Sequence, residues 1–193
     1  VRHMASARQR QDVYMAVIDQ GFVEVRELLD AKGIRRTLRR MSREIVEDAG
    51  GIDKLAIVGI HTGGVHLATR LLEFIEEDEG KRPSEGMLDI TLYRDDVLTG
   101  LPHPIVGRTE MNFDLDGTQV VLVDDVLFTG RTVRSAIDAL IDYGRPKNVK
   151  LCVLVDRGLR ELPIQPDVVG LSLTTRPDES VKVELAESGF ESD

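Results

Sequence analysis

The stretch VVLVDDVLFTGRT, residues 120–132, decides the fold class. Four apolar residues lead into the adjacent acids Asp124 and Asp125, and the loop over residues 129–132 follows shortly after. Two neighbouring carboxylates oppose each other's ionisation unless a positive group stabilises them. The stretch therefore predicts a buried strand that ends at a binding site, and it raises the question of which positive group that site receives.

The composition is that of one soluble, folded domain. The chain has 193 residues, of which 41% are hydrophobic and 31% are charged, as in ordinary globular domains. Its formal net charge of −9 argues against a general attraction of the whole chain to nucleic acid or to an anionic membrane. The single cysteine, Cys152, excludes a disulfide within the chain and argues against a zinc cluster.

Neither a membrane span nor a secretory signal is expected. No apolar stretch approaches the roughly 18 residues that a membrane-spanning helix needs, and the N-terminus lacks the apolar region of a signal peptide. We therefore expect a cytoplasmic protein with no membrane partner. Residues 1–3, which precede Met4, are expected to be a cloning remnant and receive no role.

Hydrophobic periodicity predicts alternating helices and strands. We expect helices over 34–46, 65–75 and 133–141, and strands over 55–60, 87–95, 120–123 and 149–156. Residues 97–117 show no period, and so long a loop in a compact domain indicates a lid over a binding site. Buried strands that alternate with helices predict an α/β fold with a parallel sheet, whose ligands bind at the carboxyl ends of the strands.

Two loops at that edge have the composition of phosphate-binding loops. Residues 129–132 follow a strand and begin a helix, so their backbone N–H groups and hydroxyls suit a monophosphate. They match neither the P-loop nor the dinucleotide-binding fingerprint. Asp124 and Asp125 suit either the vicinal hydroxyls of a sugar or a hydrated divalent cation, and a ribose phosphate with Mg²⁺ satisfies both readings. Residues 61–64, His-Thr-Gly-Gly, offer backbone donors to a second anion such as pyrophosphate.

These features resemble the phosphoribosyl pyrophosphate (PRPP) motif of the type I phosphoribosyltransferases. Flanking stretches resemble the PyrR family of pyrimidine operon regulators, which have uracil phosphoribosyltransferase activity: LDITLYRDD (88–96), GRTVRSAIDALIDYGRP (130–146) and VLVDRGLRELPI (153–164). The resemblance implies a central, mostly parallel sheet flanked by helices, with a small hood and a mobile loop. It covers residues 28–185, which leaves 1–27 as an N-terminal extension and 186–193 as a C-terminal tail.

The resemblance also implies a role for each matching residue. Catalysis is assigned to Asp124, Asp125, Arg94 and Asp95, the last two at the base of the mobile loop. PRPP binding is assigned to Thr62, Gly63, Val120, Val121, Leu122, Val123, Asp124, Asp125, Val126, Leu127, Phe128, Thr129, Gly130, Arg131 and Thr132. Asp156, Arg157, Leu162 and Ile164 are expected beside the uracil, which backbone groups largely read. Mg²⁺ is expected to arrive with PRPP rather than on protein ligands, and a homodimer or higher homo-oligomer is implied.

The chain departs from the family pattern at two places. Members that act by RNA attenuation typically have Lys-Thr-Arg-Gly where this chain has His-Thr-Gly-Gly at 61–64, so a fixed cation near the pyrophosphate is missing. Glycines let the backbone approach an anion closely, which keeps binding in reach but puts the catalytic rate in question. Leu159 and Gln165 stand where those members tend to have His and Arg.

A stripe of arginines marks one face of the helix over 34–46. At about 100° per residue, its members fall within one arc: Arg35, Arg36, Arg39, Arg40 and Arg43. With Arg160, the stripe suits the phosphates of a pyrimidine-operon leader RNA, as the family resemblance suggests. The other interpretation is a solvated helix face, partly paired with Glu44, Glu47 and Asp48.

Three functional hypotheses follow. The first is an enzyme that converts uracil and PRPP into UMP and pyrophosphate, with Mg²⁺. The second is an RNA-binding regulator that senses uridine nucleotides, UMP or UTP, through a retained PRPP pocket. The third is a phosphoribosyltransferase for another base, such as orotate or a purine. The PRPP motif supports the first and third equally, and the flanking resemblance favours uracil.

Overall fold

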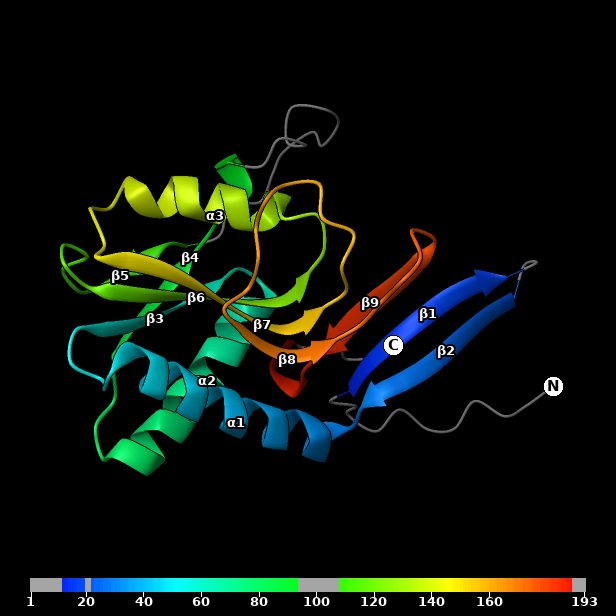
Figure 1. The fold of residues 1–193 in the computed structure, drawn as a ribbon, viewed down its shortest axis with the longest axis horizontal. Helices are drawn as coiled ribbons and strands as arrows, with labels where there is room; N and C mark the ends of the chain where they lie inside the picture. The colour runs from blue at the N-terminus through cyan, green and yellow to red at the C-terminus, as the bar shows by residue number, and fades with distance from the viewer. Residues whose placement is uncertain (1–11, 20–21, 94–107, 189–193) are drawn as a thin grey trace.

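The computed structural model of the protein describes residues 12–19, 22–93 and 108–188 (Figure 1). Its centre is a six-stranded sheet in the order β5-β4-β3-β6-β7-β8. The strands are β3 (Leu55–Ile60), β4 (Ser84–Leu88), β5 (Glu110–Met111), β6 (Gln119–Leu127), β7 (Asn148–Asp156) and β8 (Val168–Ser172). All neighbours pair in parallel except β4 and β5, which pair antiparallel. The predicted α/β fold with a mostly parallel sheet is confirmed.

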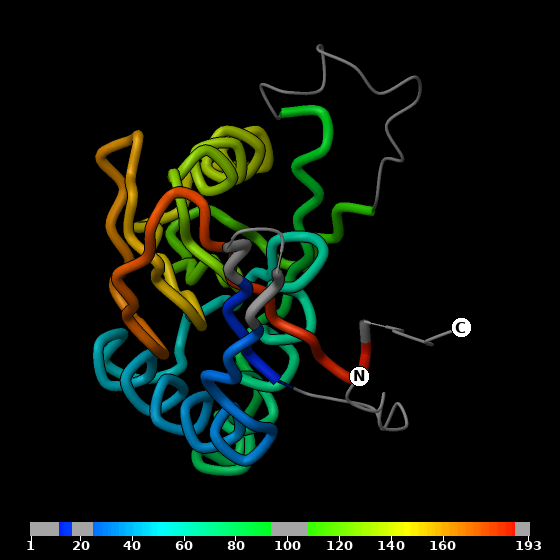
Figure 2. The backbone as a smooth tube through the Cα atoms, turned by 90° about the vertical axis from the view of Figure 1, so that its right-hand side faces the viewer, coloured from blue at the N-terminus to red at the C-terminus, as the bar shows by residue number. Residues whose placement is uncertain are grey.

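Helices cover both faces of this sheet, as the two perpendicular views show (Figures 1 and 2). The helices α1 (Ala31–Ala49) and α2 (Gly63–Glu79) pack on one face, and α3 (Arg131–Ile141) packs on the other. Alternate residues of β6 serve the two sides: Val121 and Val123 join the core under α1 and α2, whereas Val120 and Leu122 join the core under α3. A strand buried on both faces needs a continuous apolar run, which is why the stretch at 120–123 has no polar residue.

Helix α1 is longer than the period alone predicts because capping residues extend it. The carboxylate of Asp30 accepts a hydrogen bond from the backbone N–H of Gly33 at 2.7 Å, which stabilises the first turn. The helix ends at Gly50, whose φ of 71° favours glycine. Its buried residues Ile34, Leu38 and Ile45 lie at helical spacing.

A second, three-stranded antiparallel sheet lies beside the first. It comprises β1 (Asp12–Asp19), β2 (Phe22–Leu29) and β9 (Glu179–Glu184) in the order β2-β1-β9. Strands from opposite ends of the chain, drawn blue and red, therefore run side by side (Figure 2). Most of the stretch that we expected to be an N-terminal extension thus has strand structure.

The strand predicted over 87–95 was placed too late in the sequence. The strand is β4, and a 3-10 turn, η1 (Thr91–Tyr93), follows it. The carboxylate of Asp89 accepts hydrogen bonds from the backbone N–H of Thr91 at 2.8 Å and from its hydroxyl at 2.6 Å, which favours a turn over a continued strand. Of the predicted lid at 97–117, residues 97–107 lie outside the described residues, and β5 shows that the remainder is not wholly irregular. No helix in the described part of the chain is long and apolar enough to cross a membrane.

Candidate active site

Both predicted phosphate loops lie at the carboxyl ends of neighbouring parallel strands. In the register of β3 with β6, Gly59 is paired with Val123, so the loop at 61–64 emerges beside Asp124 and Asp125. The backbone N–H of His61 donates to the carbonyl of Leu88 at 2.9 Å, which holds the loop to β4 on its other side. The peptide bond between His61 and Thr62 is cis.

The glycines of the first loop allow α2 to begin directly against the acid pair. A Cβ atom at Gly64 would stand 2.1 Å from the carbonyl oxygen of Val123, and one at Gly63 would stand 2.5 Å from Oδ2 of Asp125. Real Cβ atoms essentially never approach this closely. Only glycine therefore permits this contact between the loop and the end of β6.

The two aspartates differ in their surroundings. Asp124 is only 6% exposed, and its Oδ1 accepts the backbone N–H of Asp125 at 3.0 Å. Asp125 is half-buried, and its Oδ1 accepts the backbone N–H of Val126 at 2.8 Å. Burial, followed by the charge of Asp125, raises the pKa of Asp124 well above its ordinary value. A positive group placed beside the pair would favour its ionised form, which is the arrangement that a developing cation requires.

The second loop begins α3 through a glycine of unusual conformation. Gly130 is the N-terminal capping residue of α3 and has a φ of 93°, a region that side chains rarely adopt. The first turn of the helix presents N–H groups that have no partner within the helix. The loop is attached to the segment after β7, since the carbonyl of Thr129 accepts the N–H groups of Glu161 at 3.0 Å and Leu162 at 3.1 Å. A phosphate-sized anion is suited to this helix terminus.

The residues predicted to lie beside the base are brought close to the phosphate loop. Leu162 and Ile164 lie next to Gly130, where an added Cβ would be 3.5 and 3.4 Å from their Cβ atoms. Asp156 is turned into its own loop: its Oδ1 accepts the backbone N–H of Gly158 at 2.9 Å and pairs with Arg160 at 2.6 Å. The structure thus places Leu162 and Ile164 beside the loop at 129–132 and engages Asp156 within the adjacent loop.

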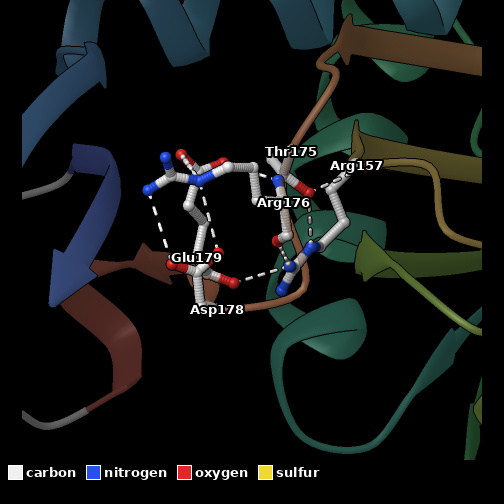
Figure 3. A network of polar contacts seen from close by, with 5 residues as sticks. All are labelled: Arg157, Thr175, Arg176, Asp178 and Glu179. Atoms are coloured by element: carbon white, nitrogen blue, oxygen red, sulfur yellow. Dashed lines mark hydrogen bonds and ion pairs between the residues drawn. The ribbon is translucent and has the colours of Figure 1, made fainter. Parts of the chain in front are cut away.

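Arg157, which was expected beside the uracil, uses its side chain to contact the second sheet (Figure 3). Its Nε donates to the hydroxyl of Thr175 at 3.1 Å, and its Nη2 donates to the carbonyls of Arg176 at 3.3 Å and Glu179 at 2.6 Å. Its guanidinium lies 4.1 Å from the ring centre of Phe128. Sequence reasoning missed Thr175, because nothing in the motif indicates a partner so far along the chain.

Arg160, which was grouped with the arginine stripe, lies instead within the strand-end loops. Its Nη1 donates to the carbonyls of Phe128 at 2.8 Å and Gly158 at 3.2 Å, and its Nε donates to the carbonyl of Ile164 at 3.0 Å. Its side chain is 13% exposed. In this conformation Arg160 stabilises the loop between β7 and β8 rather than extending the surface of α1.

Most of the stripe on α1 is paired with acids. Arg39 pairs with Asp78 at 2.7 Å and with Glu77 at 3.1 Å, and Arg43 pairs with Asp78 at 3.0 Å. The acidic end of α2, to which sequence reasoning gave no role, therefore neutralises two arginines. Arg40 pairs with Glu44 at 3.0 Å, as one interpretation expected.

The stripe also forms contacts other than ion pairs. Arg40 also donates to the carbonyls of Val169 and Gly170 in the edge strand β8. Arg35 is exposed and stacks on Phe74, with 5.2 Å from its guanidinium carbon to the ring centre. Asp48, expected to pair with the stripe, pairs with Lys150. Arg36 is exposed and forms no ion pair with any residue in the described ranges.

Arg94 and Asp95, which were predicted to belong to the lid, lie outside the described residues, but the chain that leads to them is anchored. The hydroxyl of Tyr93 donates to Oδ2 of Asp142 at 2.5 Å, and its carbonyl accepts the hydroxyl of Ser135 at 3.0 Å. Both contacts attach η1 to the α3 region. On the other side of the lid, the backbone N–H of Asp89 donates to the hydroxyl of Thr109 at 3.0 Å.

Comparisons with known proteins identify the family of the chain. The family model of the phosphoribosyl transferase domain matches residues 24–188. Proteins named "Bifunctional protein PyrR" from Thermus aquaticus and Deinococcus radiodurans are 55% and 53% identical over 161 residues, which is 83% of this chain and 89% and 88% of those proteins.

Solved structures show the same fold at lower sequence identity. A hypoxanthine phosphoribosyltransferase from Staphylococcus aureus superposes with a TM-score of 0.60 at 21% identity, covering 77% of this chain and 78% of that one. A hypoxanthine-guanine phosphoribosyltransferase from Bacillus anthracis gives a TM-score of 0.61 at 18% identity, with 76% and 82% covered.

Proposed function

The chain belongs to the phosphoribosyltransferase family and, within it, to the PyrR family, and from this we propose that it is a cytoplasmic uracil phosphoribosyltransferase. The reaction joins uracil to the ribose of PRPP and releases pyrophosphate, which gives UMP. The observation that carries the proposal is the close approach of Gly63 to Asp125, because it brings the predicted pyrophosphate loop against the acid pair near the carboxyl end of β6.

The acid pair supplies the electrostatic part of the mechanism. The bond between the anomeric carbon and the pyrophosphate breaks while a bond to a uracil nitrogen forms, so positive charge builds on the ribose in the transition state. Asp124 and Asp125 would bind the ribose hydroxyls and stabilise that charge, more strongly in the transition state than in the ground state. The positive group that the two carboxylates await is, in this proposal, the reacting sugar itself.

Backbone groups hold the two ends of PRPP. The 5′-phosphate would bind at residues 129–132, where Gly130 begins α3, and the pyrophosphate would bind at Thr62 and Gly63. With no cation in the loop at 61–64, charge on the pyrophosphate must be neutralised by other groups. Arg94 and Asp95, on the predicted lid, would complete the site and exclude water, which otherwise hydrolyses PRPP.

The carboxylates of the acid pair are suited to Mg²⁺ that arrives bound to PRPP. Asp124 and Asp125 are oxygen donors, which is the ligand type that Mg²⁺ prefers. In the described residues, no three His, Cys, Asp or Glu side chains gather in a group that could hold a metal ion. We propose that Mg²⁺ binds together with the diphosphate of PRPP, where it would neutralise the leaving group.

A panel of bases tests the proposal directly. Purified protein with PRPP and Mg²⁺ should form a nucleotide with uracil and not with orotate, hypoxanthine or guanine, as measured by chromatography of the products. Uracil is favoured because the stretches that flank the PRPP motif resemble the PyrR family, and relatives that are 53% and 55% identical carry that name. Turnover of another base would identify the third hypothesis as correct, and UMP binding without turnover would leave a sensor in place of an enzyme.

We also propose regulation of pyrimidine-operon transcription through leader RNA as a second function, supported by relatives named bifunctional. Because Arg39, Arg40 and Arg43 are engaged by acids and carbonyls, the RNA contact would rely chiefly on Arg35 and Arg36. In a gel shift with leader RNA and UMP, Arg36→Glu should weaken binding about tenfold, since a phosphate contact is replaced by repulsion. Lys147→Glu, an exposed charge reversal outside the stripe, is the matched control, and equal effects of both would exclude the stripe as the RNA surface.

A homodimer or higher oligomer completes the proposal. The hydrogen bond from Tyr93 to Asp142 places three exposed apolar residues near one another: Leu92, Ile141 and Tyr143, at 67%, 58% and 51% exposure. Clustered exposed apolar side chains are typical of contact surfaces. Light scattering of the wild type and of Ile141→Glu should show a higher mass for the wild type, and equal masses would exclude this surface.

A further inference from the structure

Phe128 connects the phosphate loop to an arginine that the reaction does not explain. The residue lies between β6 and Thr129 and is 36% exposed. The guanidinium of Arg157 lies over that ring at 4.1 Å. The backbones are also joined, since the N–H of Arg157 donates to the carbonyl of Leu127 at 3.1 Å.

Arg157 is buried, so its charge needs the partners that it has. Only 6% of the residue is exposed, and a buried guanidinium is costly unless its donors are satisfied. Thr175 forms a reciprocal pair with it: the hydroxyl accepts from Nε at 3.1 Å and donates to the carbonyl of Arg157 at 3.0 Å. The carbonyls of Arg176 and Glu179 accept from Nη2 (Figure 3).

These contacts lie on two structural units. Phe128 directly follows β6 of the six-stranded sheet, whereas residues 175–178 lead into β9 of the three-stranded sheet, which begins at Glu179. One side chain therefore joins the phosphate loop to the second sheet. The turn itself is stiffened by the carboxylate of Glu179, which accepts the backbone N–H of Arg176 at 2.7 Å (Figure 3).

We propose that Arg157 is a positioning residue that holds Phe128, and with it the loop at 129–132, against the turn before β9. The affinity for the phosphate end of PRPP then depends on the second sheet. The proposal rests on the proposed function for the identity of the ligand. It differs from the expectation that the Arg157 side chain contacts uracil, because its donors are directed to Thr175 and to backbone carbonyls.

Steady-state kinetics with each substrate varied in turn separate these roles. In Arg157→Met the stem remains but the charge and the donors are lost, so the KM for PRPP should rise about tenfold, as expected for a desolvated cation–π contact with its hydrogen bonds. The KM for uracil should change less than about twofold. Arg157→Lys keeps the charge over the ring and should recover part of the loss.

A double-mutant cycle guards against a variant that fails to fold. Phe128→Leu removes only the ring face and should raise the KM for PRPP about threefold. In the Arg157→Met background, the same substitution should have almost no further effect, because the contact is already lost. Thr175→Val provides a milder change on the other side of Arg157 and should act in the same direction, with the melting temperature of each variant measured in parallel.

The outcomes distinguish the proposal from its rivals. A lower melting temperature with an unchanged KM for PRPP would overturn it in favour of a purely structural role, and a rise confined to the KM for uracil would assign Arg157 to the base. If the wild type binds PRPP in calorimetry but does not turn over uracil, the proposed function fails, and the same cycle is then measured on the Kd for PRPP. A wild type that binds no PRPP overturns both proposals.

Discussion

The loops at 61–64 and 129–132 look alike in sequence, yet they need glycine for different reasons. Both follow a buried strand and begin a helix. In the first loop, Gly63 and Gly64 are required for space, because their positions touch Asp125 and the carbonyl of Val123. In the second loop, Gly130 is required for its φ of 93°, while the space around it is ordinary. Two similar glycine-rich sequences thus satisfy different requirements: space in the first loop and a positive φ in the second.

This difference bears on the missing cation of the first loop. In this conformation the Cβ atom of any side chain at position 63 would lie only 2.5 Å from Oδ2 of Asp125. The departure from Lys-Thr-Arg-Gly is therefore part of how the loop packs on the acid pair. The first loop gains close approach to Asp125 and gives up a fixed positive charge.

The largest expected effect comes from the acids against which the first loop packs. Changing Asp124→Asn together with Asp125→Asn should lower kcat/KM at least about 1,000-fold, because the charges that stabilise the reacting ribose are removed. The amides retain the size and the acceptor oxygens, so circular dichroism should show an intact fold. Asp53→Asn, whose side chain is 94% exposed, is the control and should keep full activity. Substantial activity in the double variant would refute the sugar-site assignment.

Replacing the glycines of the first loop tests the demand for space. Gly64→Ala should lower the free energy of unfolding by about 3 kcal/mol, since its Cβ meets rigid backbone 2.1 Å away. Gly63→Ala should cost about 1 kcal/mol, because the Asp125 side chain can rotate away, but activity should fall with that rotation. Urea unfolding and kinetics of both variants provide the comparison. Equal stability losses in the two variants would contradict the expectation that a clash with backbone costs more than a clash with a movable side chain.

The second loop should respond in proportion to its backbone conformation. Gly130→Ala should lower the free energy of unfolding by about 1 kcal/mol, the usual cost of a non-glycine residue in the left-handed region. Gly117→Ala shares the positive φ, at 71°, and has nothing within 4 Å, so it should cost about the same while leaving the KM for PRPP unchanged. A much larger loss at Gly130 would indicate that space, as in the first loop, also matters there.

The sequence predicted what depends on local pattern, and it failed where distant contacts decide. Continuous apolar runs identified β3, β6 and β7, and the parallel sheet brings the loop at 61–64 beside Asp124 and Asp125 as predicted. The strand predicted over 120–123 was too short, because β6 continues through both acids to Leu127. The pairing of β1 with β9 joins opposite ends of the chain, so no local period indicates it. The partners of Arg157 and Arg39 lie in other elements, on residues that have no pattern of their own.

The smallest effect, a pH dependence, tests whether the first loop sets the burial of Asp124. Burial and the charge of Asp125 raise the pKa of Asp124 in the folded state, so the stability that it contributes is complete below its unfolded pKa of about 3.9 and is lost as the pH rises through the folded value. Asp124→Asn cannot ionise and keeps the acceptor for the N–H of Asp125. Its stability relative to the wild type should therefore increase from pH 4 to pH 8 in urea unfolding.

The same measurement in a Gly64→Ala background shows where that burial originates. A Cβ at Gly64 would lie 3.2 Å from Cα of Asp124, so the added methyl should push the loop outward, admit water to Asp124 and reduce the pH-dependent difference. Asp53→Asn should show no pH-dependent difference from the wild type. The pH-dependent stability difference caused by Asp124→Asn could also persist unchanged in the Gly64→Ala background. That result would show that β6 alone buries the carboxylate and that the packing of the first loop does not set its pKa.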